Sequence, residues 1–180
     1  MGSLSLLNIS KNEAEAIMKV LLAIVALSLL PKLANAAEPY REEVLTLEQA
    51  QDLIAGCESY SVKHELAPVS MAVYDASGNL KFFARQDGAV FVTVEFAHIK
   101  GRTAAVSALA TSELAKIEFA DQSQPLGIRY LDHLTVVQGG VAVSSVSGQH
   151  LGGFGVSGAP AEHDEACGLA GVKNMLASNK

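Results

Sequence analysis

The sequence contains no tryptophan, and aromatic residues make up only 6% of its 180 residues. Charged residues make up 18% and apolar residues 49%, a balance typical of a globular domain rather than a disordered chain. The length suffices for one domain with a core. Because tryptophan is absent, we expect aliphatic residues, alanine and phenylalanine to fill that core.

Basic residues are scarce and form no run. The chain carries 13 lysines and arginines against 19 acidic residues, for a net charge of −6 at pH 7. Nucleic acids and anionic lipid surfaces are bound by clustered positive charge. The composition therefore argues against both as partners.

Apolar runs are short, and the clearest one resembles a secretory signal peptide. Lys19 supplies a positive charge, Val20 to Leu30 form an uncharged run, and Ala34 and Ala36 are small residues at the positions that a signal peptidase reads. The run is shorter than the roughly 20 residues that span a bilayer. We expect cleavage after Ala36, no stable membrane insertion afterwards, and a periplasmic or secreted protein.

This assignment divides the chain into three parts. Signal peptides begin at the initiator, so Met18 is the expected start and residues 1–17 an artefactual upstream segment. Residues 18–36 form the signal peptide, and residues 37–180 a single domain.

Cysteine is also rare, with Cys57 and Cys167 as the two examples. In an oxidising compartment they are able to pair. The interpretation we favour from sequence is that both are small hydrophobic residues buried in helices.

Four helices are predicted in the mature chain. The pattern Thr46-Leu-Glu-Gln49 is a capping box and begins a helix that reaches about His64. Further helices are expected over about 92–110, from Thr111 to about Phe119, and from Ala159-Pro160 to about Ala177. Gly101 interrupts the second of these, which indicates close packing or close approach of a ligand.

Five strands are predicted. Residues 69–74 and 80–85 flank the turn sequence Asp75-Ala-Ser-Gly-Asn79 and so form a hairpin. Residues 134–137, 141–146 and 151–156 lie in a glycine-rich C-terminal third. The order predicts an α+β fold with a five-stranded, largely antiparallel sheet and helices on its faces.

Gly153-Phe-Gly155-Val-Ser-Gly158 matches a dinucleotide fingerprint, but that fold needs a further parallel strand after the helix, and here the chain ends. Ser157 sits in a sequence similar to a nucleophile elbow, yet His163 follows too closely to be its base. The amides of Gly155, Ser157 and Gly158 remain candidates for binding an anion at the helix start.

No strong metal motif is present, and we predict no metal site. His163 and Cys167 are four residues apart on one helix, but no second pair has ligand spacing. On the long helix, Glu95, His98 and Arg102 share one side, either as a solvated face or as the lining of a pocket.

Several stretches together resemble the GlcG/HbpS family, and so the C-terminal domain of PduO. They cover about residues 45–176 in family order: Leu45 to Ala50, Val73 to Gly78, Arg85-Gln-Asp-Gly-Ala89, Lys100-Gly-Arg-Thr-Ala104, Thr111 to Leu114, Gly139-Gly140, Gly155 to Gly158 and Asp164-Glu165. The resemblance implies a profilin-like sheet, a homo-oligomer and, in some members, haem as a bound cofactor.

By matched position the resemblance points to Arg85, Asp87, Lys100 and Thr103 as pocket residues. Lys100 or Arg85 would pair with haem propionates. His98 is the first candidate for an axial ligand and His64 the second. The sequence has no Cys-x-x-Cys-His motif, so covalent haem attachment is excluded.

The sequence is compatible with three functions. The first is an exported haem-binding protein that serves haem storage, uptake, sensing or degradation. The second is an enzyme acting on a small organic acid, with Arg85, Lys100 and the glycine-rich start of the last helix binding the carboxylate and Asp87 or Asp164 as base. The third is an accessory subunit of another exported protein.

Overall fold

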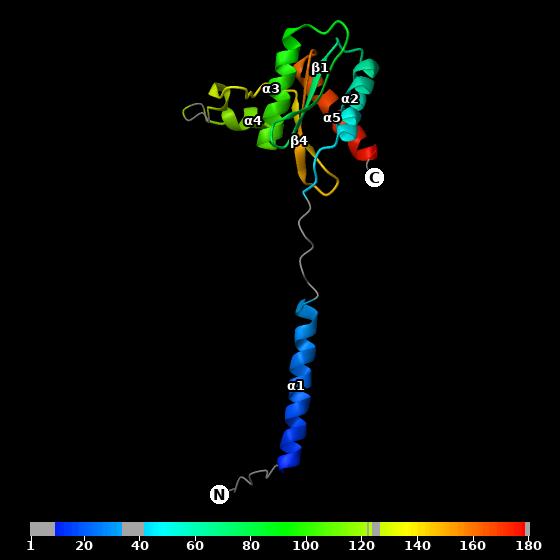
Figure 1. Ribbon diagram of the computed structural model, residues 1–180. Coiled ribbons are helices and arrows are strands. Elements are labelled where there is room, and N and C mark those ends of the chain that lie inside the picture. Colours follow the sequence, from blue (N-terminus) through cyan, green and yellow to red (C-terminus); the bar gives the residue numbers. More distant parts are fainter. Residues whose placement is uncertain (1–9, 34–41, 122, 124–126, 179–180) are drawn as a thin grey trace. The chain divides into compact units, whose positions relative to one another are not determined.

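The computed structural model describes residues 10–33, 42–121, 123 and 127–178 (Figure 1). The chain divides into two compact units, Met1–Arg41 and Glu42–Lys180. The first contains helix α1 (Lys11–Leu33), which includes the apolar run assigned to the signal peptide. No helix in the described part of the chain is both long and apolar enough to cross a membrane. The predicted cleavage point after Ala36 lies outside the described residues.

The second unit is built on a four-stranded sheet. Its strands are β1 (Ser70–Asp75), β2 (Leu80–Arg85), β3 (Gly140–Ser144) and β4 (His150–Ser157). Their order across the sheet is β2-β1-β4-β3, and every neighbouring pair is antiparallel. The predicted β1–β2 hairpin is confirmed. Asp75 stabilises its turn by accepting hydrogen bonds from the amides of Ser77 and Asn79.

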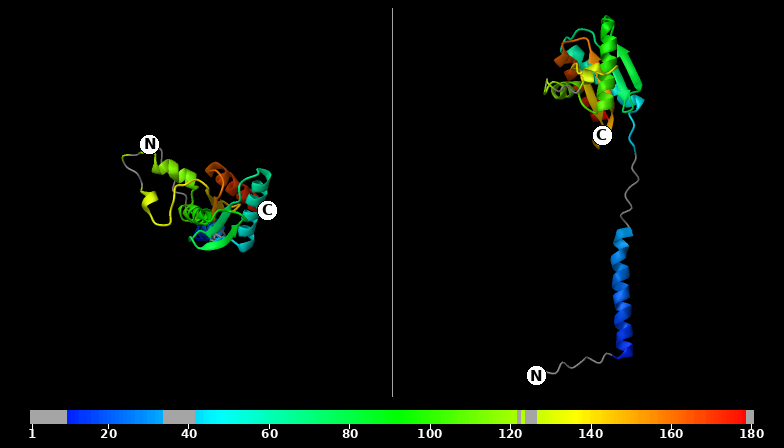
Figure 2. Two further views of the ribbon diagram at one scale, coloured as in Figure 1. Left: turned by 90° about the horizontal axis from the view of Figure 1, so that it is seen from above. Right: turned by 90° about the vertical axis from the view of Figure 1, so that its left-hand side faces the viewer.

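The helices are α2 (Leu47–Lys63), α3 (Val92–Ser107), α4 (Thr111–Glu118) and α5 (Ala161–Ser178), with a short 3-10 turn, η1 (Ile128–Tyr130). The capping box of α2 is confirmed, because Thr46 and Gln49 each bond the other's backbone amide. Figures 1 and 2 show β1 and β4 between α3 on one side and α2 with α5 on the other.

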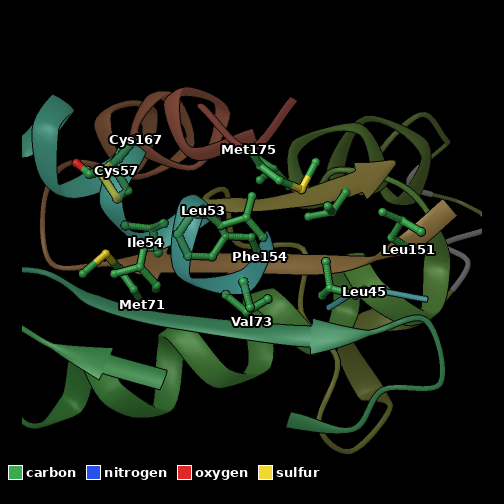
Figure 3. Close-up of a cluster of buried hydrophobic side chains, with 14 of the residues drawn as sticks. Leu45, Leu53, Ile54, Cys57, Met71, Val73, Leu151, Phe154, Cys167 and Met175 are labelled. Carbon is green, nitrogen blue, oxygen red and sulfur yellow. Dashed lines mark hydrogen bonds between the residues drawn. A yellow bond between two sulfur atoms is a disulfide. The ribbon is translucent and has the colours of Figure 1, made fainter. Parts of the chain in front are cut away.

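Alternation along the strands gives each face its own core. In β1, Met71 and Val73 face α2 and α5, whereas Ala72 and Tyr74 face α3. The larger core surrounds Phe154, which is fully buried (Figure 3). It is formed mainly by aliphatic side chains, methionine and cysteine, as expected from a sequence without tryptophan: Leu45, Leu53, Ile54, Cys57, Met71, Val73, Val141, Leu151, Val156, Cys167 and Met175.

The prediction of a fifth strand over residues 134–137 is wrong. This segment forms no strand and pairs with none among the described residues. Its amides are bonded by side chains instead: the Thr135 amide donates to Thr103 Oγ1, and the Val137 amide donates to Thr135 Oγ1. The apolar pattern was that of a strand, but the hydrogen bond from Thr135 to Thr103 attaches the segment to α3.

The favoured interpretation of the cysteines as unpaired is also wrong. Cys57 on α2 and Cys167 on α5 form a disulfide whose Cα atoms lie 4.6 Å apart, and both residues are fully buried (Figure 3). Close packing of the two helices brings them together. A Cβ on Gly56 would lie 2.8 Å from the Ala170 carbonyl oxygen of α5.

Gly101 allows α3 to lie directly on the sheet. A Cβ there would lie 2.6 Å from the Ala72 carbonyl oxygen of β1 and 2.9 Å from the Gly155 amide nitrogen of β4. Of the two reasons considered for a mid-helix glycine, the structure shows close packing. This contact fixes the position of α3, and with it the side chains on the edge of α3 that faces the hairpin.

Candidate functional site

The best-organised polar cluster lies between α3 and the β1–β2 hairpin and is centred on His98. The hydroxyl of Tyr74 lies 2.7 Å from His98 Nδ1, in a hydrogen bond. The Phe83 ring of β2 stacks on the imidazole, with ring centroids 4.8 Å apart and planes 15° from parallel. Within the described residues, no hydrogen bond occupies His98 Nε2. The imidazole is therefore held in place while one ring nitrogen remains available.

Tyr74 is mostly buried, with 9% of its surface exposed. Burial raises the pKa of its hydroxyl; nearby Arg102 opposes this shift and Glu95 adds to it. At neutral pH Tyr74 is therefore a neutral phenol and serves as a hydrogen-bonding group rather than an anion.

Apolar and cationic groups lie on the same edge of α3 as His98. Phe91 precedes His98 by seven residues and Arg102 follows it by four, so helical geometry places the three in a row. Phe91 is 70% exposed, and Arg102 is exposed without a salt bridge to any described residue. The cluster thus offers an imidazole nitrogen, an aromatic surface and a free guanidinium.

Lys100 does not belong to this cluster. It points into the interior, where its Nζ donates to Asp164 Oδ2 at 2.8 Å and to the Val156 carbonyl oxygen at 3.0 Å. Both side chains of the pair are only 3% exposed. The charge of Lys100 is already compensated within the fold.

Asp164 also occupies the start of α5. Its Oδ1 accepts a hydrogen bond from the Ala159 amide at 2.9 Å. Burial raises the pKa of its carboxyl, against the opposing effects of Lys100 and the amides of Ala159 and Gly158. The helix start considered for an external anion therefore holds a carboxylate of the chain itself.

The remaining predicted positions lie apart. Thr103 is buried and bonds the loop amide of Thr135. Gly155 lies against α3, Ser157 is 6% exposed, and Gly158 approaches the Pro68 carbonyl. The structure does not join these residues and His98 in one pocket.

Arg85 and Asp87 line a separate hollow of about 540 Å³ where β2 ends beside the last turn of α2. The other lining residues are Glu58, Ser61, Val62, Glu65, Leu66, Pro68 and Gln86. His64, the second axial candidate, is exposed at the C-cap of α2 and stacks on Tyr60 with centroids 4.1 Å apart. Three carboxylates surround the single guanidinium, which makes this hollow a poorer site for an anionic ligand.

Sequence reasoning identified His98 but missed Tyr74 and Phe83 as its partners. Both were assigned to the hairpin as strand residues. Alternation alone puts Tyr74 on the same sheet face as Ala72, but only knowledge of which helix covers that face would have pointed to His98.

Comparison with known proteins supports the fold and the family. The family model described as "Haem degrading protein HbpS-like" matches residues 45–173. Among solved structures, a double mutant of HbpS from Streptomyces reticuli is 31% identical, with a TM-score of 0.66 over 77% of this chain and 92% of that one.

Two further structures share the fold at lower identity. A PduOC:heme complex is 23% identical, with a TM-score of 0.65 over 73% of this chain and 95% of that one. The protein ORFY from Klebsiella pneumoniae is 22% identical, with a TM-score of 0.68 over 78% and 97%. Among curated proteins, none matches the chain. Because the family model matches most of the chain and the fold is shared, the chain belongs to the family described as "Haem degrading protein HbpS-like".

Proposed function

We propose that the domain over residues 42–180 binds haem, with His98 as an axial ligand through Nε2. The observation that carries this proposal is the His98 imidazole, which Tyr74 and Phe83 hold while Nε2 remains available. A neutral imidazole nitrogen is a common iron ligand in haem proteins. One similar structure is described as a haem complex, which supports the same ligand class.

The side chains near His98 fit the porphyrin ring and the propionates of haem. The exposed ring of Phe91 and the partly exposed ring of Phe83 offer apolar contact to a porphyrin. Arg102 offers a guanidinium to a propionate, and it replaces Lys100 in that role because Lys100 is committed to Asp164. Bound haem would supply iron redox and ligand-binding chemistry, and the chain's own residues would hold and orient the group.

We also propose that the protein is exported. The apolar run from Val20 to Leu30 after Lys19 supports export. The disulfide between Cys57 and Cys167 is an independent observation, because structural disulfides persist in oxidising compartments. The test is to express the chain with an epitope tag and determine the N-terminus of the product in the export compartment. A new N-terminus at Ala37 supports export, and retention of uncleaved chain in the cytoplasm contradicts it.

We further propose that the protein forms a homo-oligomer, as the family resemblance implies. Several large apolar residues before and within α3 are exposed, including Val90, Phe91 and Val92. Exposed apolar patches are typical of interaction surfaces. Light scattering should give a mass that is a multiple of the protomer, and a monomer at micromolar concentration would contradict it.

The organic-acid enzyme has less support. It required Arg85, Lys100 and the start of α5 to form one open pocket. Lys100 does reach the start of α5, but Asp164 already compensates its charge there, and among the described residues Arg85 lines a separate hollow.

A hemin titration tests the main proposal. Purified domain should shift the Soret band until it saturates at a definite stoichiometry, and the saturation should persist at high salt. Association that never saturates and disappears with salt would contradict haem binding. A panel of small organic acids in a thermal-shift assay serves as the parallel test of the alternative.

A further inference from the structure

We infer that Tyr74 is the positioning residue for His98: its hydroxyl determines which edge of the imidazole faces outward. This inference rests on the proposed haem ligation by His98, but its first measurement needs no haem.

Tyr74 is a rigid reference point. It lies in β1, between its neighbours β2 and β4, opposite Leu80 of β2 and Gly153 of β4. It is 9% exposed, and its ring contacts the imidazole edge-on at 6.0 Å and 84°. Its hydroxyl position is therefore set by the sheet rather than by a flexible surface chain.

Stacking on Phe83 fixes only the plane of the imidazole. Rotating the ring by half a turn about its Cβ–Cγ bond leaves that plane, and so the stacking, unchanged. The same rotation exchanges Nδ1 with Cδ2 and Nε2 with Cε1. A flipped ring would present a carbon where the ligand nitrogen is needed, and it would leave the buried hydroxyl of Tyr74 without its partner.

The hydrogen bond between Tyr74 and His98 Nδ1 therefore selects one of two orientations that Phe83 allows equally. The same hydrogen bond is compatible with the tautomer that iron binding through Nε2 requires, because a hydroxyl oxygen accepts as well as donates. An imidazole that binds iron through Nε2 carries its proton on Nδ1 and donates it to the Tyr74 oxygen.

The test is the variant Tyr74→Phe, which removes one oxygen atom and keeps the ring. In the haem-free protein, long-range ¹⁵N–¹H NMR of the imidazole should show a changed Nδ1 shift and a changed balance of tautomers. In hemin titrations, affinity should fall about 10- to 100-fold, the range found when an outer partner of a metal-binding histidine is lost, while the spectrum still saturates.

Tyr60→Phe is the matched control, because Tyr60 stacks on His64 and lies on α2 rather than beside His98. It should leave the His98 signals and hemin affinity unchanged. The inference is overturned if Tyr74→Phe leaves either the His98 nitrogen shifts or the hemin affinity at the wild-type value. If wild-type protein binds no hemin, the proposed function fails, and the nitrogen shifts alone decide whether Tyr74 positions His98.

Discussion

Lys100 Nζ and Asp164 Oδ2 lie 2.8 Å apart in the interior, joining α3 to the start of α5. The ammonium also donates to the Val156 carbonyl, and the carboxylate also accepts the Ala159 amide. Removing one member of a buried pair leaves the other charge uncompensated, which costs about 3–5 kcal/mol. The pair therefore holds α3, β4 and α5 together.

Lys100→Met should destabilise the fold in a pH-dependent way. Burial already raises the pKa of Asp164 above its ordinary value of 3.8, and loss of the ammonium raises it further. The folded variant therefore binds a proton more tightly than the unfolded chain, so its stability falls as pH rises through the interval from 3.8 to the folded pKa. Denaturant unfolding should show the full loss near neutral pH and a smaller loss in acid.

The exposed ion pair of Lys116 and Glu113 offers a matched control. Its side chains are 71% and 53% exposed. Lys116→Met should leave the unfolding free energy nearly unchanged at any pH, because an exposed ion pair contributes little to stability. An equally small, pH-independent effect of Lys100→Met would contradict the role given to the buried pair.

Loss of the disulfide should weaken the contact between α2 and α5. The cysteines are separated by 110 residues in sequence, so the bond constrains most of the unfolded domain. The double variant Cys57→Ala, Cys167→Ala should lose about 2–5 kcal/mol of unfolding free energy. The check is chemical denaturation with and without reductant. Reductant should lower the stability of the wild type and leave the double variant unchanged; identical curves for all samples would argue against the bond.

Gly101→Ala should destabilise the domain although alanine is the better helix former. Mid-helix substitution of glycine by alanine ordinarily gains about 1 kcal/mol. Here the added Cβ would lie 2.6 Å from the Ala72 carbonyl oxygen, so α3 must move off the sheet. We expect a net loss of about 1–3 kcal/mol from overpacking, measured by thermal unfolding. Val106→Ala, at a half-exposed position of α3 beside Gly78 of the hairpin turn, should cost less than Gly101→Ala. A stabilised Gly101→Ala would refute the tight contact.

Arg102→Gln should weaken hemin binding about two- to fivefold, the range expected when one exposed ion pair is lost. The effect should shrink at high salt, because the interaction is solvent-exposed. Arg85→Gln is the control, since Arg85 lines the hollow beside α2 instead. A larger effect of Arg85→Gln would move the propionate site to that hollow.

Local patterns predicted most of the elements. Capping at Thr46, the turn at Asp75 and the alternation in β1 depend on neighbours in sequence, so they were readable. The segment at Thr135 was misassigned because the Thr135 amide is bonded by Thr103, 32 residues away. The disulfide was missed for the same reason, since nothing local to Cys57 specifies that α5 packs there.

For the site too, local sequence patterns predicted some residues, and contacts between distant elements determined the others. His98 and Arg102 were noticed together because helical spacing relates them. Lys100 was placed in a pocket by family position, whereas its burial depends on Asp164 from another element. Tyr74 and Phe83 were missed because strand order and the helix that covers the sheet are tertiary facts.

The most direct test of haem ligation by His98 compares hemin spectra of wild type, His98→Ala and His163→Ala. His163 is a helical histidine away from the cluster and serves as the matched control. We predict that His163→Ala saturates with the wild-type Soret band, while His98→Ala loses that band or binds at least about tenfold more weakly. An unchanged spectrum and affinity in His98→Ala would contradict the central claim, and loss of the band in His64→Ala instead would assign the ligand to His64.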